Sequence, residues 1–349
     1  MIETIYRIPG VPRTALLGDF HNGDAAAVLA SLAARRPDII CIAGDLVYNR
    51  KPQGGRLMVD EQENVIPLLR GCASIAPTFM SLGNHESNLT DDDLQLIAET
   101  GTVLLDNEWA AHGSIAIGGL TSHYVLDARA FRAAHPDYQE YKDYNDYKDY
   151  QDYKDYNDYP DYNDYQAPGG SASSPGNSAA PPAADSEKLL KCKPADLKHW
   201  QPIDGPDVSW IEPAPESYAI ILSHHPEYFP KIPAAASLVL SAHAHGGQFG
   251  YYSLIRRRMC GLFAPNQGWF PKYTSGVYTK ALPAQGRQDR QGAISASRTS
   301  RADSAYSADS AYSANARQSR LVVTRGLTNT AGVPRIWNPT EIVYVEDRP

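Results

Sequence analysis

Cysteine is scarce in this sequence, and the few cysteines follow no pairing pattern. Cys41, Cys72, Cys192 and Cys260 stand far apart along 349 residues. Zinc ribbons and disulfide frameworks need closely or regularly spaced cysteines, so neither is indicated and we expect reduced thiols. With 42% apolar residues, a chain of this length can still bury a substantial core.

Long hydrophobic runs are also missing. No stretch of about 18 apolar residues is present, so we expect no transmembrane segment. The first residues, MIETIYRIPGVPRTALLGDF, contain no basic segment followed by an apolar stretch of signal-peptide length. The expected location is therefore cytoplasmic, and peripheral contact with a membrane stays compatible with the sequence.

The net charge of −8 is concentrated in one repeat. Asp137 to Tyr165 repeats Tyr-Xaa-Asp almost without a break and holds ten acidic residues and three lysines. This stretch carries −7, which leaves −1 for the rest of the chain. The acidity therefore says nothing about the charge of a substrate, and no nucleic-acid-binding surface is recognisable.

The repeat and its surroundings read as low-complexity insertions. A period of three matches neither the alternation of a strand nor the turn of a helix, so no single face can be buried. We expect one Tyr/Asp-rich and then Pro/Ser/Ala-rich insertion at 137–187 and one Ser/Ala-rich insertion at 283–319, both without fixed structure. The predicted organisation is a single domain, 1–349, that carries both insertions. A tyrosine-rich adhesive or metal-scavenging arm is the functional alternative.

The remaining sequence alternates strand-like and helix-like segments, which predicts an α/β fold with parallel strands in its first half. Helices are expected at 24–37, within 59–73 and at 90–101, with Asp24 and Thr90 as N-caps. Strands are expected at 14–19, 38–45, 77–86, 102–107, 114–120, 217–226 and 237–245.

Polar side chains gather at the ends of five of these strands. Open α/β sheets place their sites at the carboxyl ends of strands. Successive strand side chains point to opposite faces, so a pair separated by one residue is expected to face one way. Taken singly, such residues act as helix caps, turn residues or core histidines, but together they form a ligand set for two metal ions. The strand-end residues are Asp19, His21, Asp45, Asn84, His85, His224 or His225, His243 and His245.

The order of these motifs resembles the calcineurin-like metallophosphoesterase superfamily. HAHGGQF at 243–249 looks most like its bacterial branch of small phosphoesterases, and the segments after Gly268 look like the closing strands of that branch. The resemblance implies a β-sandwich of two mixed sheets flanked by helices. The sequence departs from the family at Ala242, where the family has glycine, and this change removes no ligand.

Carried over by motif, the resemblance implies two metal sites that share a bridging Asp45. His85 would lie beside the metals as the catalytic residue, and the His-Xaa-Pro spacing of the family favours His224 over His225. One ion would be held by Asp19, His21, Asp45 and His245. The other would be held by Asp45, Asn84, His224 and His243.

The expected activity is hydrolysis of a phosphodiester or phosphomonoester by in-line attack of a metal-bridging hydroxide. His85 would protonate or stabilise the leaving oxygen. Carboxylate, amide and imidazole ligands suit two divalent ions among Mn, Fe, Zn, Ni and Co. The phosphate-ester substrate and the oligomeric state stay open.

Other classes of protein also fit parts of the pattern. Amidohydrolase barrels use a His-Xaa-His pair, but on their first strand, whereas here the pair comes last. A non-catalytic binding module on the same fold would be expected to lack a ligand, and every ligand position is filled. A surface-interaction protein acting through the Tyr-Xaa-Asp repeat would keep its binding when Asp45 and His243 are replaced.

Overall fold

The computed structural model describes most of the chain outside the expected insertions. Residues 137–187 and all but the end of 283–319 lie outside the described residues, so the expectations about them stay untested. Contacts divide the chain into two compact units, Met1–Val125 with Asp204–Pro349, and Leu126–Ile203. The described residues are 1–49, 56–134, 205–212, 218–233, 236–254, 258–280, 318–328 and 335–347.

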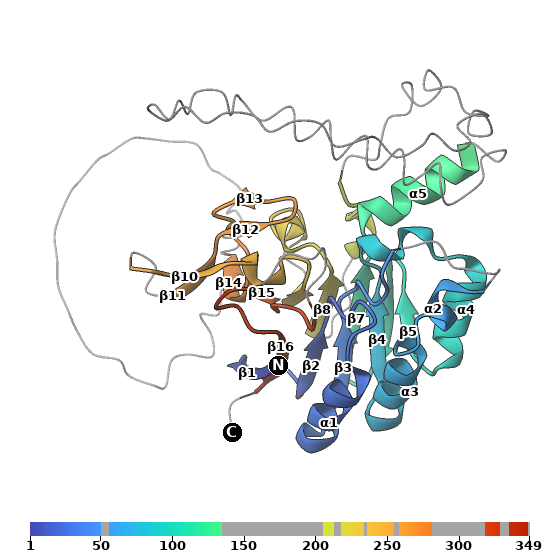
Figure 1. Ribbon diagram of the computed structural model, residues 1–349, viewed down its shortest axis with the longest axis horizontal. Coiled ribbons are helices and arrows are strands. Elements are labelled where there is room, and N and C mark those ends of the chain that lie inside the picture. Colours follow the sequence, from blue (N-terminus) through green and yellow to red (C-terminus); the bar gives the residue numbers. More distant parts are fainter. Residues whose placement is uncertain are drawn as a thin grey trace, which may run out of the picture. The chain divides into compact units, whose positions relative to one another are not determined.

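The first sheet has six strands in the order β1-β16-β2-β3-β4-β5 (Figure 1). Strands β2 to β5 run parallel, as expected for the first half of the chain. The last strand of the chain, β16, enters between β1 and β2, parallel to β1 and antiparallel to β2. The strands are β1 (Ile2–Arg7), β2 (Thr14–Leu17), β3 (Ile39–Ile42), β4 (Thr78–Ser81), β5 (Val103–Leu105) and β16 (Glu341–Glu346).

The second sheet also has six strands, in the order β14-β15-β9-β8-β7-β6. Its centre, β7, β8, β9 and β15, is parallel, and the edge strands β6 and β14 are antiparallel to their neighbours. The strands are β6 (Glu108–His112), β7 (Ile115–Leu120), β8 (Tyr218–Ser223), β9 (Leu238–Ser241), β14 (Gly276–Lys280) and β15 (Ser319–Val323).

The two sheets bury one hydrophobic core between them. Leu16 and Cys41 of the first sheet belong to the same buried cluster as Ile220 and Leu240 of the second. Central strands such as β3 are buried at every position, because helices or loops cover the outer face of a sheet whose inner face lies against its partner. Two packed mixed sheets with flanking helices confirm the fold expected from the resemblance.

Two helices, α1 and α4, begin where the sequence predicts, whereas α5 was not predicted. Asp24 caps α1 by accepting a hydrogen bond from the Ala27 N–H, and Thr90 caps α4 with a reciprocal bond to Asp93. The helix expected within 59–73 is instead a short helix followed by a longer one. The helices are α1 (Ala25–Arg35), α2 (Met58–Glu61), α3 (Val65–Ile75), α4 (Asp91–Glu99) and α5 (His123–Ala134), and the 3₁₀ turns are 84–88, 209–211, 226–228 and 245–247.

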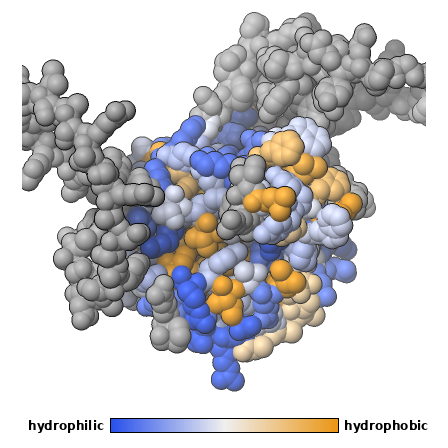
Figure 2. Space-filling view, turned by 90° about the vertical axis from the view of Figure 1, so that its left-hand side faces the viewer, coloured by the Kyte–Doolittle hydropathy of each residue, from blue (hydrophilic) through white to orange (hydrophobic). Residues whose placement is uncertain are grey.

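Two small hairpins follow the last 3₁₀ turn and carry exposed apolar side chains. Figure 2 looks onto this side and shows hydrophobic residues interspersed with hydrophilic ones. None of the described helices has the length and hydropathy that crossing a bilayer requires. The hairpin strands are β10 (Gly250–Ser253), β11 (Arg258–Gly261), β12 (Phe263–Ala264) and β13 (Gly268–Trp269), and the exposed apolar side chains include Tyr252, Leu254, Met259, Trp269, Phe270, Ile336 and Trp337.

Candidate metal centre

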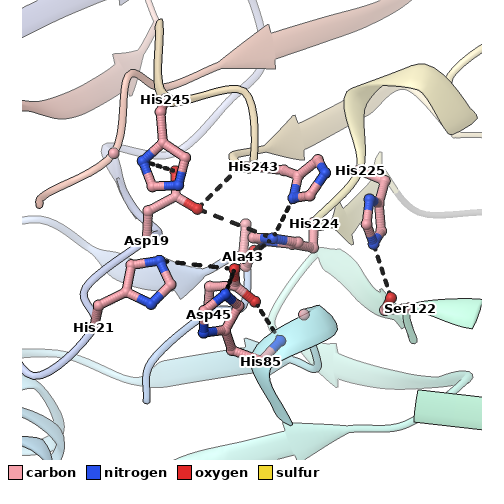
Figure 3. A network of polar contacts seen from close by, with 12 residues as sticks. Asp19, His21, Ala43, Asp45, His85, Ser122, His224, His225, His243 and His245 are labelled. Atoms are coloured by element: carbon pink, nitrogen blue, oxygen red, sulfur yellow. Dashed lines mark hydrogen bonds and ion pairs between the residues drawn. The ribbon is translucent and has the colours of Figure 1, made fainter. Parts of the chain in front are cut away.

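Side chains from five strand ends converge on one buried cluster. The contributing strands are β2, β3 and β4 of the first sheet and β8 and β9 of the second, each at its carboxyl end (Figure 3). The cluster therefore lies at the edge of the sandwich where α/β folds place their sites. Its imidazole and carboxylate members are Asp19, His21, Asp45, His224, His243 and His245.

The side chains converge for a different reason from the one expected. Strand β2 ends at Leu17 and β9 ends at Ser241, so the alternation of strand side chains does not reach these residues. They lie instead in tight turns with left-handed backbone, which non-glycine residues adopt at some cost in free energy. The φ angles are 49° at Asp19, 43° at His21, 54° at Asp45, 64° at His243 and 44° at His245.

One half of the cluster groups Asp19, His21 and His245. Their ligand-type atoms lie within 4.8 Å of one another. His245 Nδ1 is 3.9 Å from Asp19 Oδ2, and His21 Nε2 is 3.7 Å from Asp45 Oδ2. Asp45 thus faces this group as well as the next one.

The other half groups Asp45, His224 and His243. His224 Nε2 lies 3.1 Å from both Asp45 Oδ2 and His243 Nδ1. Asn84 belongs to the 3₁₀ turn after β4. The next residue, His85, donates its backbone N–H to Asp45. The two groups contain the carboxylate and imidazole members of the two expected ligand sets, and Asp45 faces both groups.

The hydrogen bonds of two histidines fix the ring nitrogen that faces the cluster. His224 Nδ1 lies 2.7 Å from the carbonyl oxygen of Ala43, and His21 Nδ1 lies 3.1 Å from that of Val47. A carbonyl oxygen only accepts, so each Nδ1 is the donor and each neutral ring presents the lone pair of Nε2 inward. Metal-binding histidines are commonly oriented in this way.

Orphaned polar atoms test whether these residues fit metal ions. Among the described residues, four buried atoms of the expected ligands have no hydrogen-bond partner, although one of them, Asp45 Oδ2, forms an ion-pair contact with His224 Nε2 at 3.1 Å. The four atoms are Asp19 Oδ2, His21 Nε2, Asp45 Oδ2 and Asn84 Oδ1. Leaving such an atom unpaired costs about 1–3 kcal/mol, and native proteins rarely tolerate several together. Since all four are oxygen or imidazole donors, the cluster fits divalent cations.

The two remaining histidines of the predicted site occupy different positions. His85 Nε2 lies 3.8 Å from Asp45 Oδ2, and its side chain is 24% exposed, whereas the other rings facing Asp45 are fully buried. His225 points away from Asp45, toward Ser122 and Glu227. Of the two neighbouring histidines, His224 is therefore the one that lies against Asp45.

Burial and mutual charge shift the titration of these groups strongly. Burial opposes ionisation of Asp45, but the charges of His224 and His85 hold its pKa well below the usual value. Burial likewise disfavours the charged ring of His224, yet Asp45 raises its pKa to about 9. Burial lowers the pKa of His21 and of His243 well below the usual value. Anionic Asp45 and the neutral rings of His21 and His243 are therefore in the state that binds cations, whereas His224 must first release the proton that Asp45 favours.

Glu86 is an important residue that the sequence reasoning did not assign. Its fully buried carboxylate accepts backbone hydrogen bonds from Gly83 (2.7 Å), Asp45 (2.9 Å), Leu46 (2.7 Å) and Val47 (3.4 Å). Burial and the nearby Asp45 charge raise the pKa of Glu86 to about 7, against the effect of these N–H groups. Glu86 therefore holds the turn that presents Asp45.

Replacing Glu86 by Gln is expected to destabilise this turn. An amide group would point its own N–H toward backbone donors, and the loss of unfolding free energy should be about 2–3 kcal/mol. Urea unfolding monitored by circular dichroism measures it. Glu108→Gln, at an exposed strand position, is the matched control. Equal stability of the two variants would contradict the role of Glu86.

Arg335 is the second residue that the sequence did not reveal. Its guanidinium donates to the carbonyl oxygens of Arg325 (2.7 Å), Thr328 and His245 (3.3 Å), and one nitrogen lies 3.1 Å from His245 Nδ1. Burial lowers its pKa, and the Asp19 charge opposes that shift. Arg335 thus fixes the loop that carries His245 and adds positive charge beside the cluster.

The alanine that departs from the family pattern has a structural counterpart. Ala242 is fully buried directly after β9, and a methyl group on Gly18 would lie only 2.4 Å from its Cβ. Gly18 precedes Asp19, so the two small residues let the backbones that carry Asp19 and His243 approach closely. The additional methyl of Ala242 occupies the space that Gly18 leaves open.

A double-mutant cycle tests this close approach. Gly18→Ala alone is expected to lower the unfolding free energy by about 1–3 kcal/mol, because the two methyl groups overlap. Adding Ala242→Gly should restore most of that loss, giving a strong interaction between the two positions. Thermal or urea unfolding of the four proteins provides the measurement. Additive effects would show that the methyl groups do not meet.

Buried carboxylates and imidazoles meet at one edge of the α/β sandwich, and their donor atoms fit divalent cations. The fold and this cluster place the protein in the class of α/β sandwiches with a candidate divalent-cation site at a sheet edge. The chain matches the calcineurin-like phosphoesterase family over residues 12–247. Because this match covers more than half of the chain, the protein belongs to that family.

Other comparisons add little. The comparison with curated proteins gives no match. Among solved structures, one crystal structure aligns with 31% of this chain and 52% of its own chain, at 17% identity and a TM-score of 0.24. The chain thus spans about half of that protein, and so low a TM-score carries no argument.

Proposed function

We propose that the protein is a dinuclear metal-dependent phosphoesterase that hydrolyses a phosphodiester or phosphomonoester. The carrying observation is the set of four buried donor atoms without a hydrogen-bond partner. Three belong to Asp19, His21 and Asp45, which are members of the two groups that meet at Asp45, and the fourth is Asn84 Oδ1 in the turn after β4. Asp19, His21, Asp45 and His245 would hold one ion, and Asp45, Asn84, His224 and His243 the other. Bound divalent ions at such a site activate water, hold phosphoryl oxygens and stabilise developing charge.

The residues of the chain supply the remaining steps. Because His85 Nδ1 accepts a hydrogen bond from the Asn49 N–H at 3.2 Å, the neutral ring carries its proton on Nε2, the atom that faces Asp45. This partly exposed ring is placed to donate a hydrogen bond from Nε2 to the oxygen that leaves phosphorus, and to pass that proton on where water returns one to Nε2. Arg335 holds the loop that carries His245 by donating to the carbonyl oxygens of His245 and Arg325.

Three wider statements belong to the same proposal. The chain is one phosphoesterase domain, 1–349, with insertions at 137–187 and 283–319. It acts in the cytoplasm, with or without peripheral contact with a membrane. The ions come from Mn, Fe, Zn, Ni and Co, whose preferences the mixed ligand set satisfies.

Metal removal and return is the direct experiment. Dialysis against a chelator should abolish hydrolysis of a panel of phosphomonoesters and phosphodiesters. Adding back Mn²⁺, Co²⁺, Zn²⁺, Ni²⁺ or Fe²⁺ one at a time should restore hydrolysis. Each of the two proposed ligand sets should then hold one ion. Activity that survives complete chelation, or metal-loaded protein that hydrolyses no member of the panel, would contradict the proposal and favour a binding protein on this fold.

A further inference from the structure

A second ligand-like cluster lies directly beside the two proposed metal sites and shares only His243 with them. His225, Glu227 and His243 each direct one donor atom to a common region, and these atoms lie within 4.8 Å of one another. His225 and His243 are nearly or fully buried, whereas the Glu227 side chain is 21% exposed. Two imidazoles and a carboxylate form a donor set that zinc uses in proteins.

The spacing of the atoms matches a small cation. His225 Nδ1 is 3.2 Å from Glu227 Oε1. In a tetrahedral zinc site with bonds of about 2.0–2.2 Å, neighbouring ligand atoms lie about 3.3–3.6 Å apart. The second carboxylate oxygen, Glu227 Oε2, is buried and has no hydrogen-bond partner among the described residues. The exposed edge of Glu227 leaves a route by which an ion could enter.

Asn266 lies beside both rings, at the distance expected between neighbouring ligand atoms. Its Nδ2 is 3.4 Å from His225 Nδ1 and 3.2 Å from His243 Nε2, so a positively polarised amino group stands beside both ring nitrogens. Its Oδ1 accepts a hydrogen bond from the Tyr124 hydroxyl at 3.2 Å. Rotating the amide by half a turn would exchange these atoms and give a fourth donor, since a tyrosine hydroxyl can also accept.

With the Asn266 amino group turned toward it, His225 Nδ1 faces two partners that require opposite protonation of the ring nitrogen. Glu227 Oε1 requires a proton on His225 Nδ1, whereas the Asn266 amino group requires a lone pair there. His225 Nε2, at 2.8 Å from the Ser122 hydroxyl, is satisfied as donor or acceptor. Once the Asn266 amide is rotated, an ion bound by Nδ1, Oε1 and the amide oxygen satisfies all three residues, because each then acts as an electron-pair donor.

We propose that His225, Glu227, His243 and Asn266 form a third divalent-cation site, selective for zinc-like ions. This site depends on the proposed function only through His243, which belongs to both. The Nδ1 atom of His243 faces His224, and its Nε2 atom faces Asn266. When both nitrogens bind an ion, the imidazole releases its remaining proton to solvent. That loss makes the third ion bind more weakly than the pair, so the site fills at higher metal concentration.

Metal stoichiometry tests the site without relying on activity. The metal-free protein and its Glu227→Gln variant are dialysed against increasing Zn²⁺, and bound zinc per chain is measured by elemental analysis. The wild-type chain is expected to bind one more ion than the variant at saturation. Glu108→Gln, at an exposed strand position, is the matched control and should bind as the wild type does.

Two further variants keep the test decisive. His225→Gln should lose the same ion, and combining it with Glu227→Gln should lose no other. Asn266→Asp should tighten the third ion on the order of tenfold, because a carboxylate replaces an amide ligand. A purely structural role of Asn266 predicts no such gain, since the substitution removes its amino group.

The possible outcomes separate the two proposals. Equal stoichiometry in wild type and Glu227→Gln, or no gain in Asn266→Asp, would overturn the third site and leave the pair untouched. The converse result is a protein that does not bind the two ions of the proposed function but binds one ion fewer after Glu227→Gln. That result would support the third site and contradict the proposed function.

Discussion

Asp45→Asn is expected to lower kcat/KM on the order of a thousandfold or more and to reduce the metal bound by the proposed pair. The Asp45 carboxylate is the group that both halves of the cluster share. Its Oδ2 faces His21, His85 and His224, and its Oδ1 accepts the His85 backbone N–H at 2.9 Å. An amide removes one negative charge and turns an N–H group toward cations, so binding and catalysis should fail together.

The same strand provides a matched control for this change. Asp38 stands just before β3, is exposed and pairs with Arg13, whereas Asp45 stands just after β3 and is buried. Asp38→Asn should leave hydrolysis and metal content unchanged, because an exposed ion pair contributes little. Kinetics, elemental analysis and urea unfolding of both variants provide the comparison. An Asp45→Asn protein that keeps two ions and near-normal turnover would contradict the bridging role.

Much of the fold was predictable because local signals agreed with tertiary structure. Asp24 and Thr90 cap helices as predicted, and apolar runs such as Ile39–Ile42 became fully buried parallel strands. Strands β1 and β6 were not predicted from the sequence. Each is largely exposed and is held by pairing with a partner, β16 or β7, so its own residues signal burial only weakly.

The candidate site was predictable in its membership but not in its geometry. Residue type and order were enough to predict that Asp19, Asp45 and His243 lie together, because the carboxyl ends of strands in an α/β sandwich share an edge. The predicted cause, alternation along a strand, was wrong, since left-handed turns orient these side chains. A turn of this kind depends on contacts with distant backbone, which one sequence does not display.

Glu86 and Arg335 show the other limit. Glu86 acts by accepting backbone N–H groups from residues about 40 positions earlier, and Arg335 binds carbonyl oxygens on two separate loops. Neither contact leaves a residue pattern, because any backbone offers the same partners. The one available signal was a glutamate directly after Asn84 and His85, in a segment already assigned to the site.

His85→Ala is expected to lower kcat by about 10²–10⁴-fold on substrates with poor leaving groups while leaving the bound metal unchanged. The His85 ring presents Nε2 to the cluster, and its side chain is 24% exposed, so it can meet a substrate that the buried rings cannot reach. Protonating the departing oxygen matters most for an alkoxide and least for a stable phenolate. The loss should therefore be much smaller with a p-nitrophenyl ester.

The comparison of two leaving groups distinguishes proton donation from metal binding. His21, Asp45 and His85 also lie close enough to hold an ion together, so a ligand role for His85 is the specific competitor. If His85 were a ligand, the alanine variant would lose an ion and would lose activity equally on both kinds of ester. His112→Ala, a ring on strand β6 that packs against Phe79, controls for the general effect of removing an imidazole. A leaving-group-dependent loss at full metal content therefore assigns His85 to the proton and the buried rings to the metal.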